Sequence, residues 1–274
     1  SFNKNNVMEQ TQPTQPAPTQ EQKFQFPTEE VTLPSKGLLY PEGSPLKSGV
    51  VRMKYMTARE EDILTNQNYI KNGTVIDKVL QSLLVDTTKV EDLLIGDKNA
   101  IIVAARILGY GQDYSFKYPH PQTGEEEEIT IDLTEAEDKY FDENLMINGK
   151  NEFEFELPTS KALLTFKLLT QADDKKIEAE LKGLKKINKT SSPELTTRLK
   201  HVIQSVNGDR TQKVIRDFVD KQFLARDARA FRAYLETIMP DIDLTFDLTF
   251  SDGTVVEDVT VPIGVNFFWP DASV

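Results

Sequence analysis

Two stretches of the chain share a pattern that favours a strand running directly into a capped helix. Thr57 is followed three residues later by Glu60, and Thr170 is followed three residues later by Asp173. A threonine with an acidic residue three positions on is typical of a capping box, in which the two side chains satisfy backbone N–H groups at the start of a helix. An apolar run typical of a strand precedes each threonine. The sequence therefore predicts the unit of strand, cap and helix at two places.

The segments around these two patterns also match in kind and in order. Leu33-Pro34-Ser35-Lys36 precedes the first pattern, and Leu157-Pro158-Thr159-Ser160-Lys161 precedes the second. Each pattern is followed by helix-like sequence and then by strand-like runs around a polar glycine turn, at residues 114–133 and 244–263. Capped helices after strands also recur by chance. The shared order of these features nevertheless favours a divergent duplication of a module of roughly 100 residues.

The two halves predict an α+β fold of two related modules, each packing short strands and a β-hairpin on several helices. We place the first module at residues 31–150 and the second at residues 151–274. Residues 97–109 are apolar on almost every side, which predicts the buried central helix of the first module. We expect Asp97 to cap that helix and Gly109 to end it.

Residues 1–30 form a segment rich in proline, glutamine and threonine. Because such a segment has no hydrophobic face to bury, it cannot offset the entropy lost on ordering, and we predict a disordered, solvated tail. The alternative is an arm that becomes ordered against a neighbouring subunit. Phe24 and Phe26 are the apolar side chains that would anchor such an arm.

The C-terminal segment places three aromatic residues in a row before a proline. One interpretation is that they close the core of the second module. Since adjacent side chains on an extended segment face opposite ways, they cannot all enter one core, and the remainder would form an exposed anchor for a partner. The candidate partner-binding residues of the whole chain are Phe267, Phe268, Trp269, Pro270, Phe24 and Phe26.

The charge balance restricts the partners of the chain. It has 274 residues and a formal net charge of −12, which argues against non-specific binding to nucleic acid or to an anionic membrane. No apolar run approaches the roughly 18 residues of a membrane span. The beginning of the sequence also lacks the basic start and apolar core of a signal peptide. These features favour protein partners.

The sequence contains few residues suited to catalysis or metal binding. There is no cysteine, so disulfides and thiolate chemistry are excluded, and with two histidines a zinc site would need carboxylates from elsewhere. We find no nucleophile motif, no phosphate-binding loop and no metal-ligand spacing. We therefore expect no cofactor, no metal and no enzymatic activity. A catalytic carboxylate pair stays open, because acids are abundant and only geometry would select two of them.

Several motifs together carry a resemblance to a known family. They are Leu33-Pro34-Ser35-Lys36-Gly37 with Tyr40-Pro41, Met56-Thr57-Ala58-Arg59-Glu60-Glu61-Asp62-Ile63-Leu64, Gly96-Asp97-Lys98-Asn99-Ala100 running to Arg106, Gly109-Tyr110-Gly111, and Phe267-Phe268-Trp269-Pro270. From about Val31 onward the chain resembles the baseplate hub subunit and hub assembly family of contractile-tailed, T-even-type bacteriophages. Some members of that family carry paired cysteines in the hairpin segments. This chain has none there, which argues against a metal.

The resemblance implies a structural component of the phage tail baseplate hub that acts through protein–protein association during baseplate assembly. Its partners would be other hub or tail-tube proteins, with a homo-oligomer as a further option, and no nucleic acid or membrane. It would reside in the virion, and in the host cytoplasm during assembly. The alternatives are a transient assembly chaperone absent from the mature virion and, less favoured, a carboxylate-based cell-wall hydrolase.

Overall fold

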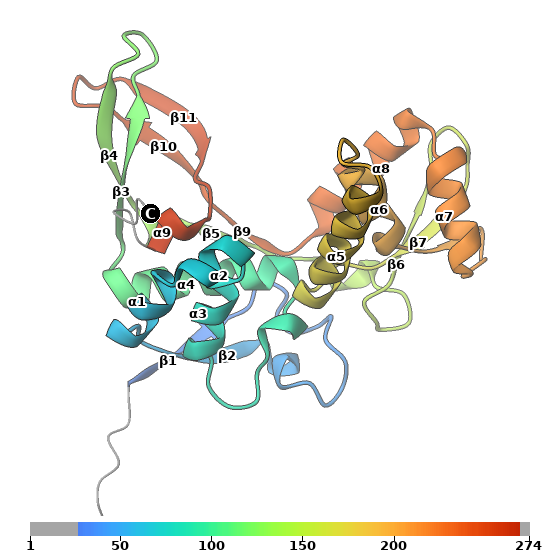
Figure 1. Ribbon diagram of the computed structural model, residues 1–274, viewed down its shortest axis with the longest axis horizontal. Helices are drawn as coiled ribbons and strands as arrows, with labels where there is room; N and C mark the ends of the chain where they lie inside the picture. The colour runs from blue at the N-terminus through green and yellow to red at the C-terminus, as the bar shows by residue number, and fades with distance from the viewer. Residues whose placement is uncertain (1–26, 269–274) are drawn as a thin grey trace, which may run out of the picture.

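The computed structural model describes residues 27–268, and its helices and short strands form two lobes (Figure 1). The strands are β1 (Thr28–Thr32), β2 (Val50–Lys54), β3 (Asp113–Pro119), β4 (Glu126–Asp132), β5 (Glu137–Lys139), β6 (Phe153–Glu156), β7 (Leu163–Phe166), β8 (Ile203–Val206), β9 (Asp241–Asp243), β10 (Thr245–Thr249) and β11 (Val255–Thr260). The helices are α1 (Ala58–Leu64), α2 (Gln67–Asn72), α3 (Val75–Leu83), α4 (Ile95–Tyr110), α5 (Gln171–Ile187), α6 (Glu194–Val202), α7 (Gln212–Lys221), α8 (Ala225–Ile238) and α9 (Val265–Phe268). The predicted α+β class is confirmed.

The sheets are all small and antiparallel. β1 pairs with β2, β3 with β4, β5 with β9, and β10 with β11, while β6, β7 and β8 form one three-stranded sheet. Two-stranded ribbons are marginal by themselves, because they need a packed partner to bury their apolar face. Helix α4 packs against β9, and the ribbon of β10 packs against β4 of the other hairpin. We call residues 151–240 the helical lobe and residues 27–145 with 241–268 the first lobe.

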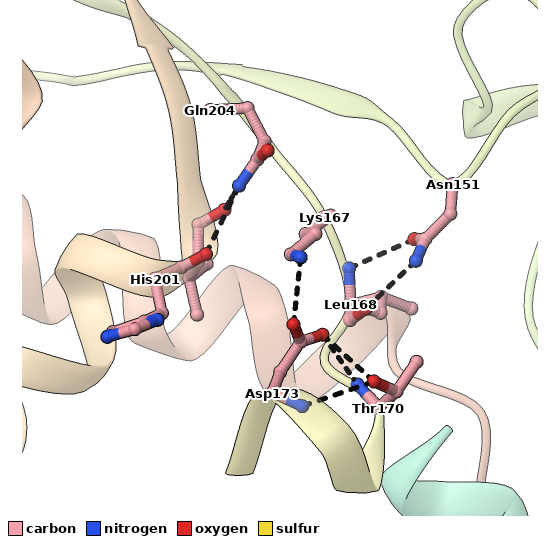
Figure 2. Close-up of polar contacts among 8 residues, drawn as sticks. Asn151, Lys167, Leu168, Thr170, Asp173, His201 and Gln204 are labelled. Carbon is pink, nitrogen blue, oxygen red and sulfur yellow. Dashed lines mark hydrogen bonds and ion pairs between the residues drawn. The ribbon is translucent and has the colours of Figure 1, made fainter. Parts of the chain in front are cut away.

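Both predicted capping boxes are present at the starts of α1 and α5. The Thr57 backbone N–H donates to Glu60 Oε2 over 2.7 Å, and the Thr170 backbone N–H donates to Asp173 Oδ2 over 3.0 Å. Figure 2 shows the second box, where Lys167 Nζ also lies 3.0 Å from the Asp173 carboxylate. The strands β2 and β7 run directly into these helices, as the sequence pattern predicts.

The two Leu-Pro segments form equivalent loops, and each loop is held by a buried aspartate near the start of a distant helix. In the first lobe, Asp97 on α4 accepts hydrogen bonds from Ser35, while in the helical lobe Asp227 on α8 accepts from the backbone of Thr159 and Ser160. Asp97 and Asp227 are both the third residue of their helix, and a leucine N-cap precedes each. This shared tether extends the repeat beyond what the sequence pattern predicted.

Helix α4 forms the centre of the first lobe, but its ends differ from the prediction. It begins at Ile95 after Leu94, so Asp97 lies inside the first turn. Asp97 does not cap the helix because its carboxylate bonds to the loop at Ser35 instead. Gly109 also does not end the helix, which continues to Tyr110. Its missing side chain makes room for Met56, whose sulfur would lie 2.6 Å from a Cβ there.

The chain returns to the first lobe after α8, contrary to the predicted second module of residues 151–274. β9 pairs with β5, β10 packs against β4, and α9 packs against α4 (Figure 1). The physical reason is that the second hairpin buries its apolar face against the equivalent first hairpin. Residues 241–268 therefore belong spatially to the first lobe.

The N-terminal segment joins the fold earlier than predicted. Residues 1–26 lie outside the described part of the chain, and Phe24 and Phe26 lie there with them. Residues 28–30 were assigned to the tail, but they form the start of β1. Their lack of apolar side chains is offset by cross-strand contacts, since Tyr55 Oη donates to Glu29 over 2.6 Å and Arg52 Nη2 donates to Thr28 over 2.9 Å. Within residues 27–268, no helix is long and apolar enough to cross a bilayer.

Candidate interaction surface

The two hairpins lie side by side and project together from the first lobe (Figure 1). We call residues 113–132 and 245–260 the hairpin pair. Their tips are joined by His120 Nε2, which lies 2.9 Å from Asp252 Oδ2. The Ser251 backbone N–H also donates to Glu127 Oε1 over 2.6 Å. These contacts brace the projection at the end that is farthest from the helices.

The hydrogen bonds of His120 determine which nitrogen carries its proton. His120 Nδ1 accepts from the backbone N–H groups of Gln122 and Thr123, over 3.1 and 3.4 Å. Nδ1 is therefore unprotonated, and the Nε2 proton is donated to Asp252. Hydrogen bonds from Thr254, and then from His120, lower the pKa of Asp252 to about 2. Asp252 is thus an ionised acceptor at neutral pH.

The hairpin pair has a small apolar interior of its own. The buried side chains along its facing strands are Ile129, Ile131, Phe246, Leu248 and Phe250. The His120 ring completes this interior, with its centroid 4.9 Å from that of Phe250 in an edge-on arrangement. Each large apolar side chain buried in this way contributes about 2 kcal/mol of transfer free energy. The projection is therefore held together by packing as well as by hydrogen bonds.

The outer surface of the hairpin pair is strongly acidic. The pair contains ten acidic residues and a single lysine, Lys117. The acidic residues are Asp113, Glu125, Glu126, Glu127, Glu128, Asp132, Asp247, Asp252, Glu257 and Asp258. Most of the net charge of −12 is therefore concentrated on this one projection. Glu126, Glu127 and Glu128 lie in β4, where Glu127 accepts the hydrogen bond from Ser251.

The helical lobe has the opposite charge balance. Residues 171–232 contain fifteen lysines and arginines and nine acidic residues. Several of these cations are paired, such as Arg198 with Asp174, Lys200 with Asp220 and Arg216 with Glu180. Salt bridges of this kind are consistent with a solvated helix surface. Charge is nevertheless unevenly distributed over the molecule, with an acidic hairpin pair and a basic helical lobe.

The C-terminal aromatic residues do not form an exposed anchor where the structure describes them. Phe267 and Phe268 are 1% and 0% exposed, and both pack in the core of the first lobe rather than of a second module. The sequence predicted an extended segment here, but both residues lie on the short helix α9. A helical turn brings neighbouring residues to one side more readily than a strand does. Trp269 and Pro270 lie outside the described residues.

Arg106 joins this C-terminal helix to the base of the hairpin pair. Its guanidinium donates to the carbonyl oxygens of Phe267, Gly111 and Asp113, over 2.9, 2.9 and 3.2 Å. Burial lowers the pKa of Arg106. Beside it, a cavity of about 840 Å³ lies between β3 and residues 262–267. One side chain thus fixes α4, β3 and α9 relative to one another.

The chain matches a family model described as T4 bacteriophage base plate protein, over residues 27–269. The chain belongs to this family. It is therefore a structural protein of the phage baseplate, which is part of the tail of the virion. Comparison with curated proteins and with solved structures found no match.

The buried carboxylates of this baseplate protein have structural partners. Glu60 and Asp173 accept from helix starts, and Asp97 and Asp227 accept from the Leu-Pro loops. Across residues 27–268, no cluster of histidine and carboxylate side chains has the geometry to hold a metal ion. Sequence reasoning missed the two loop tethers. A usable signal was present, because a leucine three residues before each aspartate and an alanine three residues after it occur in both repeats.

Proposed function

We propose that this baseplate protein is a component of the baseplate hub and that it acts by docking the hairpin pair onto a basic surface of a neighbouring baseplate protein. The observation that carries the proposal is the combination of rigidity and charge on one projection. Because its interior is packed and its tips are joined, the projection keeps its shape before contact. A preformed surface of this kind reduces the ordering cost of association.

The acidic exterior would act mainly on the rate and the choice of partner. Complementary charges steer an encounter and disfavour partners of the same charge, while the closer contacts determine how long a complex lasts. We therefore expect a partner with lysine and arginine side chains facing the strands β4 and β11. Other hub proteins and tail-tube proteins are the candidate partners, and assembly would take place in the host cytoplasm. The protein would act without catalysis.

The docking proposal is tested by reversing charge on the outer face of β4. Glu126 and Glu128 are exposed, so Glu126→Lys with Glu128→Lys changes the surface without touching the interior. We expect this double variant to fold normally and to be depleted from assembled tails in cells infected with phage that lacks the native gene. The matched control is Glu178→Lys with Asp62→Lys, which changes the net charge equally on two other exposed helical positions.

Normal incorporation of the β4 double variant would overturn the docking proposal. Mass spectrometry of purified particles and of the infected lysate tests the hub assignment separately. A fixed copy number in finished particles supports a resident hub component. Presence in the lysate alone contradicts that assignment and favours an assembly chaperone.

A further inference from the structure

Within residues 27–268, one stripe of helix α4 has no covering element. Ala100, Val103, Ala104, Ile107 and Leu108 follow the spacing of one helical face. Ala100 and Val103 are buried, but the other three side chains are only half-buried. The sequence predicted that α4 is surrounded by protein on almost every side. In the described part of the chain, this stripe instead forms the floor of an open groove.

The groove has an apolar floor and an acidic rim. Its volume is about 410 Å³, and residues 29–32 of β1 line one wall. Leu133, Ala136 and Ile242 also line the groove and add to its apolar surface. Glu29, Glu30 and Asp138 also line the groove, so carboxylates border the apolar floor.

The strand β1 lines the groove and has one edge without a partner among the described strands. Among the described strands it pairs with β2 alone, through the register from Thr28 with Lys54 to Thr32 with Val50. Its other edge can therefore accept a further strand. An extended segment added to a free edge gains backbone hydrogen bonds, and its alternate side chains supply the specificity. The occupant that fits this groove is extended, with apolar side chains at alternate positions.

We propose that the groove binds the segment Lys23-Phe24-Gln25-Phe26 of a second copy of this chain. In an extended conformation Phe24 and Phe26 lie on the same face, so both can contact the α4 stripe while Gln25 faces away. The positive charge of Lys23 complements the acidic side chains of the rim. The segment directly precedes Pro27 and Thr28, where the described chain begins at the edge of the groove.

The donor is a second copy because the same chain cannot reverse sharply enough. Thr28 of β1 is already paired with Lys54 of β2. For residues 23–26 of the same chain to fold back along β1, the chain would have to turn at residues 26–28. Two-residue hairpin turns favour glycine or asparagine with positive φ, whereas Pro27 is restricted to a φ near −65°. Exchange of the segment between two copies avoids this turn, and a two-fold arrangement would fill both grooves.

The proposal is independent of the hairpin pair, which lies on other elements of the first lobe. Failure of the docking experiment on β4 would therefore leave it unaffected. Its own test uses the absence of cysteine in the native chain, since any disulfide must come from introduced residues. One chain carries Phe26→Cys and a second chain, distinguishable by mass, carries Leu108→Cys.

Mixing the two chains under mild oxidation should give a disulfide-linked heterodimer. A bridge requires the two Cα atoms to come within roughly 7 Å, which random contact does not sustain. Two control pairs should give at least tenfold less product. One combines Phe2→Cys with Leu108→Cys, and the other combines Phe26→Cys with Ile187→Cys on the exposed end of α5. Equal yields in all three mixtures would overturn the proposal.

A second measurement follows self-association of the full chain by sedimentation equilibrium. Phe24→Ala with Phe26→Ala should weaken dimerisation at least tenfold, while Phe2→Ala should leave it unchanged. Ala104→Arg should weaken it to a similar extent, with Ile187→Arg as its control. The Phe24/Phe26 variant alters none of the described residues, so it decides the question even if Ala104→Arg fails to fold. A native chain that is monomeric at all concentrations, or a disulfide formed only within a single doubly substituted chain, would contradict the proposal.

Discussion

Asp97 and Asp227 occupy the same position in the two repeats, but they lie in different surroundings. Asp97 accepts from the Ser35 backbone N–H and hydroxyl, over 2.9 and 2.5 Å, and from Tyr40 Oη over 2.7 Å. Asp227 accepts from two backbone N–H groups, those of Thr159 and Ser160, over 2.8 and 2.9 Å. Both tie a Leu-Pro loop to a helix start. The first tether uses side-chain hydroxyls in addition to the backbone.

The electrostatic consequence differs in sign between the two tethers. Burial raises the pKa of Asp97 and outweighs the hydrogen bonds that lower it, with the nearby Asp241 carboxylate adding to the rise. Burial also acts to raise the pKa of Asp227, but the hydrogen bonds from Ser160 and Thr159 outweigh it, so its pKa is lowered. One fold position therefore supports a carboxyl that resists ionisation in one repeat and favours it in the other.

Burial is the largest cause of the raised pKa of Asp97, and the returning C-terminal segment adds to the rise through Asp241. Strand β9 crosses the start of α4, which places Asp241 near Asp97 and the Pro240 carbonyl against Gly96. No described segment plays the equivalent part over α8, where Arg226 corresponds to Gly96 and is exposed. The first tether therefore lies under the returning segment, while the second lies beside exposed residues of α8. The two equivalent positions therefore share hydrogen bonds to a Leu-Pro loop but differ in electrostatic environment.

The largest expected effect comes from removing the central tether. Asp97→Ala would leave the Ser35 N–H, the Ser35 hydroxyl and the Tyr40 hydroxyl without their acceptor. Each buried group left unpaired costs about 1–3 kcal/mol, so we expect a loss of about 4 kcal/mol in the free energy of unfolding. Urea unfolding measures this loss. Asp62→Ala, at an exposed position, serves as the control and should change stability by less than about 0.5 kcal/mol.

The same substitution at the peripheral tether tests the comparison directly. Asp227→Ala leaves the backbone N–H groups of Thr159 and Ser160 unpaired at a partly buried loop. We expect a smaller fall in the urea midpoint than for Asp97→Ala. A fall as large as that of Asp97→Ala would mean that the two tethers are equivalent and that the side-chain donors of the first add nothing.

The next effect concerns the crossing of β9 over α4. A Cβ at Gly96 would lie 1.7 Å from the Pro240 carbonyl oxygen, which is backbone and cannot rotate away. Gly96→Ala should therefore displace β9 and cost about 2 kcal/mol, within the range for overpacked sites. Arg226→Ala is the matched change in the other repeat and should lie within about 0.5 kcal/mol of the native chain. Equal stability of the two variants would show that β9 does not constrain the first repeat.

The sequence predicted local features better than long-range ones. The capping boxes at Thr57 and Thr170 and both hairpins were predictable, because each depends on residues a few positions apart. The return of the second hairpin to the first was not predictable, since its pattern of alternating residues specifies a buried face but not the surface that covers it. Phe267 was assigned to the wrong module for the same reason.

For the candidate surfaces too, local features were predictable from the sequence and long-range contacts were not. The acidic composition of the hairpin pair could be read from the sequence, but its position as one braced projection depends on the contact of His120 with Asp252, 132 positions apart. The stripe on α4 was visible as an apolar helix. Only the fold shows that Ile107 and Leu108 are left half-covered.

The smallest expected effect is a difference in pH dependence between the two tethers. For Asp227, whose folded pKa lies below the unfolded value of about 3.9, the stabilisation is present above that pH and is lost on acidification. Asp97 has a raised folded pKa, so the folded state binds more protons and stability falls as pH rises above about 4, by at most about 1.4 kcal/mol per pH unit. Urea midpoints between pH 3.5 and 7 are compared for the native chain, Asp97→Asn and Asp227→Asn. The advantage of the native chain should shrink with rising pH relative to Asp97→Asn and grow relative to Asp227→Asn. Slopes of the same sign would mean that the pKa values of Asp97 and Asp227 do not shift in opposite directions on folding.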